Sequence, residues 1–170
     1  MNEKLQKAIQ SIQEQFSGEV KEFRGEFTLI VSPEDIVSVC QMLRDDFNFK
    51  LLGSLTATDY WPERNPRFHL SYQLHNIDEK ITLRLRVALP GDNPSIPTIE
   101  GVFLNANWHE RELYDMFGIH IQGHSDLRRI LMPYDWVGHP LRKDYPLGYE
   151  EPQFTFNFEE IEAKKIYAKE

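Results

Sequence analysis

Imidazole and carboxylate side chains gather in one stretch of this sequence, where they could bind a metal ion or perform acid–base chemistry. They are His109, Glu110, Glu112, Asp115, His120, His124, Asp126, Asp135 and His139. Such ligands suit zinc or iron, and a hydrolase could be built from them. However, no H-E-x-x-H motif occurs, and His109 and Glu112 could share a helix face without a second histidine to support them. We therefore expect no metal site. A stand-alone metal-dependent hydrolase that uses His109, Glu112, His120 or His124 is the weaker alternative.

Signals for other cofactors are also missing. The sequence contains neither G-x-G-x-x-G nor G-x-x-x-x-G-K-[ST], the glycine motifs that bind dinucleotides and nucleotide phosphates. Its single cysteine, Cys40, cannot hold an iron–sulfur cluster or a structural zinc ion, which need several ligands of this kind. Cys40 follows Val39 on an apolar helical stripe, so we expect it in the core. Glu110 and Glu112 are two residues apart and would not face each other on a helix. We expect neither catalytic residues nor a bound cofactor on this chain.

A helix rich in charges and aromatic rings is predicted before Gly118. Asn107-x-x-Glu110 resembles a capping box that would start it, and glycine is a typical residue at a helix end. Arg111 can reach Asp115 one turn later. The pattern fits either a partly solvated amphipathic helix or a recognition helix, and both interpretations stay open.

Basic and apolar residues alternate in the segments 126–131 and 138–146. A long irregular stretch is usually functional or disordered, and the aromatic and branched residues here argue against disorder. Arg, Tyr, Trp and Met are enriched in the cores of protein interfaces. We therefore predict an extended arm that packs on a partner protein. Phosphate binding by Arg128, Arg129, Arg142 and Lys143 is the competing use, which the net charge of −8 weakens.

Hydrophobic periodicity predicts the elements that position these residues. Helical spacing indicates an N-terminal helix that ends before Gly18. Residues 20–31 form a short hairpin that turns at Arg24-Gly25, and Ser32 caps a second helix with Pro33 in its first position.

The middle of the chain is rich in strands. Residues 51–60 favour a strand, and the alternating segments 68–75 and 81–89 form the clearest hairpin. Residues 91–97 are predicted as a loop, and a weak helical pattern covers 158–167.

We predict an α+β fold, a two-layer domain with a mostly antiparallel or mixed sheet and helices on one face. This domain covers residues 1–118, and residues 119–170 form an extended irregular C-terminal arm rather than a second domain. The acidic chain is not expected to bind nucleic acid. It has no long apolar run and no secretory signal pattern, so membrane contact is expected only through a partner.

Three sequence blocks resemble a known family. They are Glu110-Arg111-Glu112-x-Tyr114-Asp115-Met116-Phe117-Gly118-Ile119, then Gly123-His124-x-Asp126-Leu127-Arg128-Arg129-Ile130-Leu131, then Gly138-His139-Pro140-Leu141-Arg142-Lys143-Asp144-Tyr145-Pro146-Leu147. In this order they closely resemble the C-type subunit of the proton-pumping NADH:quinone oxidoreductase, respiratory complex I, whose mitochondrial equivalent is the 30-kilodalton subunit. Weaker similarity extends the match over roughly residues 50–150. Ser125 departs from the pattern, because the family usually has proline there, and we expect a less rigid loop.

The resemblance implies a peripheral-arm subunit without flavin, iron–sulfur cluster, NADH or quinone site of its own. It implies a position beside the quinone-site subunit, which is of the 49-kilodalton type, and near the cluster-bearing subunits. This position lies on the cytoplasmic side of a bacterial inner membrane. The equivalent subunit of a membrane-bound hydrogenase, an F420H2 dehydrogenase or a ferredoxin-accepting complex remains an alternative.

The partner interface is predicted at the motif residues. They are Glu110, Arg111, Glu112, Tyr114, Asp115, Phe117, Gly118, His124, Asp126, Leu127, Arg128, Arg129, His139, Pro140, Leu141, Arg142, Lys143, Asp144, Tyr145 and Pro146. We expect the cations Arg128, Arg129, Arg142 and Lys143 to pair with acidic groups on neighbouring subunits. Charge reversal at Arg129 or Arg142 should then lower assembly and leave the isolated fold largely intact.

Overall fold

The computed structural model describes residues 3–16, 18–146 and 163. The predicted helical pattern at 158–167 lies outside these residues, apart from residue 163. The elements, in chain order, are α1 (Glu3–Phe16), β1 (Glu19–Phe23), β2 (Glu26–Val31), a short 3-10 helix η1 (Pro33–Asp35), α2 (Ile36–Asp45), β3 (Leu51–Asp59), β4 (Phe68–Asn76), β5 (Ile81–Leu89), β6 (Ser95–Pro97), α3 (Ala106–Phe117) and β7 (His120–Gln122).

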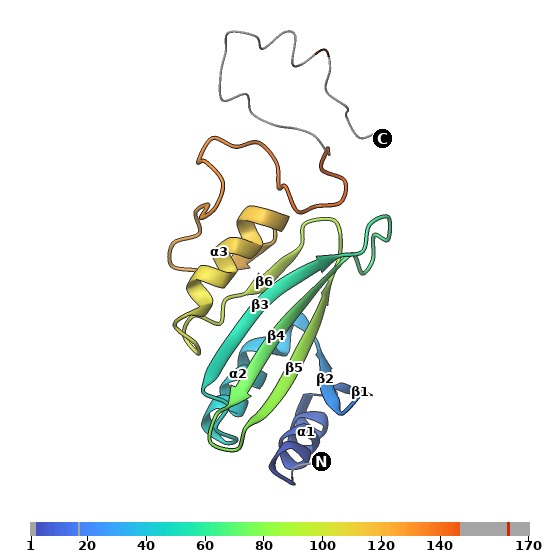
Figure 1. The fold of residues 1–170 in the computed structure, drawn as a ribbon, viewed down its shortest axis with the longest axis vertical. Helices are drawn as coiled ribbons and strands as arrows, with labels where there is room; N and C mark the ends of the chain where they lie inside the picture. Colours follow the sequence, from blue (N-terminus) through green and yellow to red (C-terminus); the bar gives the residue numbers. More distant parts are fainter. Residues whose placement is uncertain (1–2, 17, 147–162, 164–170) are drawn as a thin grey trace.

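Five strands form the central sheet in the order β1-β2-β5-β4-β3 (Figure 1). All neighbours are antiparallel except β2 and β5, which run parallel, so the sheet is mixed as predicted. The β4–β5 hairpin pairs Phe68 with Leu89 at one end and Asn76 with Ile81 at the other, which confirms the alternating pattern. The β1–β2 hairpin turns at Arg24 and Gly25, whose φ angles of 54° and 81° fit a tight turn.

One face of the sheet carries the core. The inward positions of β4 and β5 are buried and, apart from Asn76 at the end of β4, apolar, and α2 lies behind the strands in Figure 1. Phe117 of α3 packs edge-on against Phe68 of β4, with ring centroids 6.4 Å apart, so α3 joins the same core. Cys40 is fully buried in α2, and burial raises the pKa of its thiol, as expected for a core residue. The α+β prediction with helices on one face is confirmed.

Two predicted helix caps are wrong, although the helical segment after Ser32 begins with Pro33 as expected. Ser32 makes no capping bond with its side chain, and the residues after it form η1 before α2 begins at Ile36. The backbone carbonyl of Ser32 instead accepts from the amide of Asp35 at 3.2 Å. In α3 the residue before the helix is Asn105, so Asn107 lies inside the helix and does not cap it.

The predicted loop 91–97 contains a strand. β6 lies before α3 in the chain and β7 lies after it. The two strands pair in parallel, so this small sheet joins the segments that enter and leave the helix. Each strand has three residues, too few for an alternating pattern to be visible.

Candidate functional site

The predicted interface residues lie on α3 and on the segment 118–146, which we call the C-terminal segment. In Figure 1 it runs in orange past the end of α3 toward one end of the central sheet. Three clusters of hydrogen-bonded charged and polar side chains attach it to the domain. Their partners come from α3, from the residues around β6 and from the ends of β3 and β4.

Asp115 of α3 forms the first cluster. Its fully buried carboxylate accepts hydrogen bonds from the amides of Ile130, Leu131 and Met132 at 3.0, 2.8 and 2.9 Å. The guanidinium of Arg129 donates to its other oxygen at 2.6 Å. Burial alone would raise the pKa of Asp115, but these four donors outweigh it and the pKa is lowered. Asp115 is therefore an ionised anchor that fixes the backbone at 130–132.

Arg67, just before β4, forms the second cluster. Its guanidinium makes two hydrogen bonds with Asp59 at the end of β3 and two with Asp144 of the C-terminal segment, all between 2.7 and 2.9 Å. The amide of Lys143 also donates to Asp59 at 2.9 Å. Burial acts to raise the pKa of Asp59, but the bonds from Arg67 and from the amides of Lys143 and Trp61 outweigh it and lower the pKa. The cluster joins the end of the sheet to residues 143–144.

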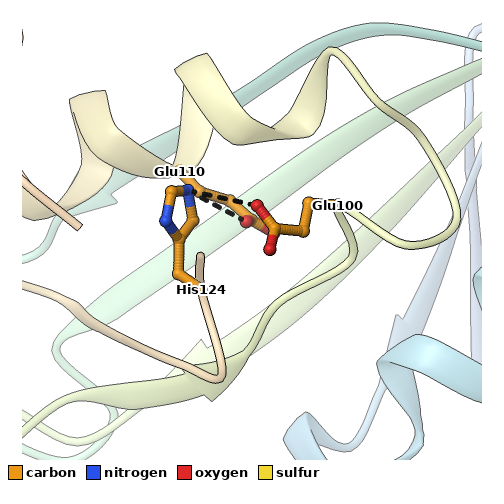
Figure 2. A group of neighbouring side chains, drawn as sticks. All are labelled: Glu100, Glu110 and His124. Carbon is orange, nitrogen blue, oxygen red and sulfur yellow. Dashed lines mark ion pairs between the residues drawn. The ribbon is translucent and has the colours of Figure 1, made fainter. Parts of the chain in front are cut away.

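Glu110 of α3, Glu100 and His124 form the third cluster (Figure 2). The Nε2 atom of His124 lies 3.8 Å from an oxygen of each carboxylate. Glu110 accepts from the amide of Ile99 at 2.7 Å and from the hydroxyl of Thr98 at 2.5 Å. Burial raises the pKa of Glu110, since these bonds only partly offset the loss of solvent.

The donor set of this third cluster does not fit a metal ion well. The Nδ1 atom of His124 accepts from the amide of Asp126 at 3.0 Å, which places the ring proton on Nε2. That proton is directed at the carbonyl of Asn107, 3.1 Å away, so neither ring nitrogen offers a free lone pair. Glu100 in turn accepts from the amide and hydroxyl of Ser125. These hydrogen bonds hold the loop at residues 124–126 to α3 and to Glu100.

The residues of the alternative hydrolase do not assemble. Within the described part of the chain, Glu100, Glu110 and His124 are the one group of three potential metal ligands close enough to share an ion. His109, Glu112 and His120 do not belong to it. His120 and Glu112 are exposed.

The end of α3 is capped by the C-terminal segment. Gly118 has a left-handed φ of 69°, and a Cβ there would lie 2.5 Å from the ring of His139. His139 Nδ1 lies 3.0 Å from the carbonyl of Asp115, the amide of Leu141 donates to Met116, and Arg142 donates to the carbonyl of Phe117. Helix carbonyls that lack an intrahelical partner are thereby satisfied.

Several predicted roles are corrected. Arg111 does not reach Asp115 but donates to the carbonyls of Arg128 and Arg129 at 3.1 and 3.0 Å. Within the chain, Arg129 pairs with Asp115, and Arg142 donates to the carbonyl at the end of α3. The expected pairing of these two cations with neighbouring subunits stays a prediction. Charge reversal of either would disturb the fold itself.

The cations Arg128 and Lys143 have exposed side chains, and Arg128 pairs with the exposed Asp126. Other predicted interface residues with exposed side chains are Glu112, Leu141, Asp144 and Pro146. Leu147, the last residue of the third sequence block, lies outside the described part.

Sequence reasoning missed Asp59, Arg67, Thr98 and Glu100. A signal existed for Asp59, because it follows Leu55 and Ala57 at alternating positions that face the core. A carboxylate at an inward position must find a partner. The identity of that partner could not be read from spacing alone.

Seven large apolar side chains on α3, on the loop before it and on the C-terminal segment are exposed. They are Leu104, Trp108, Ile130, Leu131, Tyr134, Val137 and Leu141. Tyr134 and Val137 are 93% and 82% exposed. A patch of this kind is typical of a protein interface.

Comparison with known proteins identifies one family. Residues 29–151 match the family described as "Respiratory-chain NADH dehydrogenase, 30 Kd subunit". The chain is 50% identical over 151 residues to the C-type subunit of the NADH-quinone oxidoreductase of Roseiflexus sp. (strain RS-1), and the match covers 88% of this chain and 86% of that protein. It is 45% identical over 144 residues to the corresponding NADH-quinone oxidoreductase subunit of Geobacter sulfurreducens, covering 83% and 89%.

Solved structures share the fold. Nqo5 in a trypsin-resistant fragment (1-134) superposes with a TM-score of 0.65 at 25% identity, covering 73% of this chain and 99% of that one. A chain of the membrane-bound sulfane sulfur reductase, an archaeal respiratory membrane complex, gives a TM-score of 0.68 at 24% identity, covering 85% and 87%. At that identity the second likeness shows the fold alone.

Proposed function

The chain belongs to the family of the 30-kilodalton subunit of respiratory-chain NADH dehydrogenase, and on that premise we propose that it is a structural subunit of an NADH:quinone oxidoreductase. It supports assembly of the peripheral arm next to the 49-kilodalton-type, quinone-site subunit and the cluster-bearing subunits. The complex transfers electrons from NADH to quinone and couples this to proton translocation, while this chain contributes no catalytic residue.

One observation carries the proposal, namely the rigidly held apolar patch of the C-terminal segment and the adjoining part of α3. Seven of the large exposed apolar residues lie between Leu104 and Leu141. Five of them lie on the C-terminal segment, whose backbone is held by hydrogen bonds from its amides to Asp115 and Asp59. Apolar side chains on a fixed backbone lose little conformational freedom on binding, so they favour a permanent partner surface.

We propose further that flavin, iron–sulfur clusters, NADH and quinone bind to the partner subunits and not to this chain. The buried Cys40 is the one cysteine of the sequence, and burial raises its pKa, which disfavours the thiolate that binds metals. His124, Glu100 and Glu110 already make hydrogen bonds within the chain, and neither ring nitrogen of His124 offers a free lone pair.

We place the chain on the cytoplasmic side of a bacterial inner membrane, held there through the complex. No helix in the described part of the structure is long and apolar enough to cross a membrane. We propose that the predicted arm, residues 119–170, packs on the neighbouring subunits through its described part, residues 119–146.

Affinity purification of the tagged chain from native membranes tests the proposal. The expected result is stoichiometric recovery of flavin and iron–sulfur subunits together with NADH:quinone reductase activity. Recovery with hydrogenase-type, F420-dependent or ferredoxin-dependent partners would move the chain to a related complex. Recovery of the chain alone from membranes that contain an intact NADH:quinone oxidoreductase would refute the proposal.

A pair of variants tests the interface itself. Leu131→Asp places a charge in the patch, where Leu131 is 63% exposed, and should lower the amount of chain in the complex. Ile77→Asp is the control, because Ile77 is 66% exposed in the β4–β5 turn, away from the patch. Both variants should unfold at nearly the same urea concentration as the wild-type chain. Equal recovery of both in the complex would contradict the assigned surface.

A further inference from the structure

The second face of the central sheet is open. The outward positions of β3, β4 and β5 alternate with buried ones and are partly or fully exposed. The strands lie side by side in Figure 1, with α2 behind them. We call these outward positions the open sheet face. They are Ser54, Thr56, Thr58, His69, Ser71, Gln73, His75, Thr82, Arg84, Arg86 and Ala88.

The outward residues of β3, β4 and β5 carry positive charge, whereas the chain as a whole is acidic. They include two arginines and two histidines and no aspartate or glutamate, whereas the whole chain carries 27 acidic and 19 basic residues. Arg84 is partly neutralised by Glu26 on the adjacent strand β2, at 3.2 Å. A basic face on an acidic protein is a feature that electrostatic complementarity exploits.

Arg86 is the central cation of this face. Its Nε donates to Nδ1 of His69 at 3.0 Å, and its Nη2 donates to the hydroxyl of Tyr60 at 3.1 Å. The Nδ1 atom of His69 carries no proton, since it accepts from arginine. Burial and the charge of Arg86 lower the pKa of His69, which keeps the ring neutral. Among the described residues no carboxylate forms an ion pair with Arg86, although the charge of Glu63 acts on the neighbouring His69.

The cradle formed by Tyr60 and His69 fixes the guanidinium in place. The two rings pack edge-on with centroids 4.7 Å apart, and the guanidinium lies 5.7 Å from the Tyr60 ring centroid. Arginine and tyrosine held in this way are typical of the residues that dominate interface energies. A fixed guanidinium can bind a carboxylate through two parallel hydrogen bonds.

A hollow of about 300 Å³ lies on the same face, and its lining includes Gly53, His75 and the ion pair of Arg84 with Glu26. Gly53 creates space here, because a Cβ at this position would clash with Nε2 of His75. The hollow offers hydrogen-bonding groups, and the Arg86 cradle adds a positive charge on the same face.

We propose that the open sheet face docks an acidic segment of a neighbouring subunit, with Arg86 binding one of its carboxylates. The inference rests on the proposed function and assigns a second partner surface, separate from the apolar patch of the C-terminal segment. We take the occupant to be an acidic polypeptide, because Arg86 is held in place without a carboxylate partner among the described residues and can therefore bind an anion. The neighbouring Ser, Thr and Gln side chains suit a polypeptide that needs hydrogen-bond partners.

Zero-length cross-linking of the purified complex tests this proposal. Arg86→Lys places a primary amine at the site, and carbodiimide then couples it to any carboxylate in direct contact. The expected product joins residue 86 to an aspartate or glutamate of another subunit, identified by mass spectrometry. Arg24→Lys, in the exposed β1–β2 turn, is the control that should give no such product.

Charge reversal gives a second measurement. Arg86→Glu should lower retention of the chain in the complex by about tenfold relative to Arg24→Glu, and high salt should weaken the wild-type chain's retention. If the chain co-purifies with its subunits but residue 86 couples to none of them and reversal has no effect, the docking proposal is refuted and the proposed function stands. If no redox subunits co-purify at all, both the docking proposal and the proposed function are refuted.

Discussion

Replacing Asp115 by asparagine isolates the contribution of the buried anchor at the end of α3. Asparagine keeps the shape of the side chain but removes the charge and puts an amide donor where donors already converge. At least one of the bonds to Arg129 or to the amides of residues 130–132 must then be lost. Breaking a buried ion pair by changing one partner costs about 3–5 kcal/mol. Arg129 retains some solvent contact, so we expect the lower end, about 3 kcal/mol.

Hydrogen exchange is the assay that localises this loss. A change of about 3 kcal/mol should speed exchange of the amides of Ile130, Leu131 and Met132 by a factor on the order of one hundred, where exchange follows local opening. Asp126→Asn is the matched control, since Asp126 pairs with Arg128 at 2.9 Å on the surface and should contribute less than about 1 kcal/mol. Similar exchange at 130–132 in both variants would refute the reasoning.

The same variant should show a characteristic pH dependence. The pKa of Asp115 is lowered in the folded chain, so its stabilising effect is fully present above the unfolded pKa of about 3.9 and is lost as the pH falls through the folded value. The difference in unfolding free energy between wild type and Asp115→Asn should therefore shrink below about pH 4. A difference that stays constant from about pH 6 to about pH 3 would show that the carboxylate is not the source of the stability.

Three further predictions concern the other contacts of the C-terminal segment. Arg67→Lys cannot keep both paired contacts to its two carboxylates and should lower the unfolding free energy by about 3 kcal/mol, measured by urea titration. Gly118→Ala should cost about 2 kcal/mol or more in the same titration, because of its positive φ and the close ring of His139, whereas Gly101→Ala, with open space around it, should change stability by less than about 0.5 kcal/mol. The raised pKa of Glu110 means that its ionised form is disfavoured in the fold, so Glu110→Gln should gain stability relative to wild type as the pH rises from about 4 to 8. A pH-independent difference would contradict that assignment.

Local signals in the sequence predicted the local parts of the fold. The β4–β5 hairpin has nine residues of alternation on each side, and its register follows directly from that pattern. Gly118 ends α3 as expected, since a left-handed residue is needed where the chain leaves the helix. These features depend on neighbours in the sequence, so a single sequence was enough to place them.

Contacts between distant segments were not predictable in the same way. The Asn107–Glu110 spacing predicted a capping box, but Glu110 accepts from Thr98 and Ile99, which follow β6 directly. Arg111 was placed opposite Asp115 by helical spacing, although the carboxylate is taken by Arg129 and three backbone amides. In both cases a partner from outside the helix makes stronger bonds than the helical neighbour can.

The positions of the charges explain how one chain can hold two different surfaces ready for partners. Along the C-terminal segment, the carboxylates of Asp59 and Asp115 bind backbone amides as well as arginines, so the main chain is fixed and the apolar side chains above it need little further ordering. On the open sheet face, Arg86 is fixed by neutral groups, which leaves its charge uncompensated within the described residues. Preorganisation thus favours burial of apolar area on one side and binding of a carboxylate on the other. A mobile irregular segment or an unordered sheet surface would bind a partner poorly. Because hydrogen bonds within the chain hold both surfaces in place, both are suited to the proposed assembly.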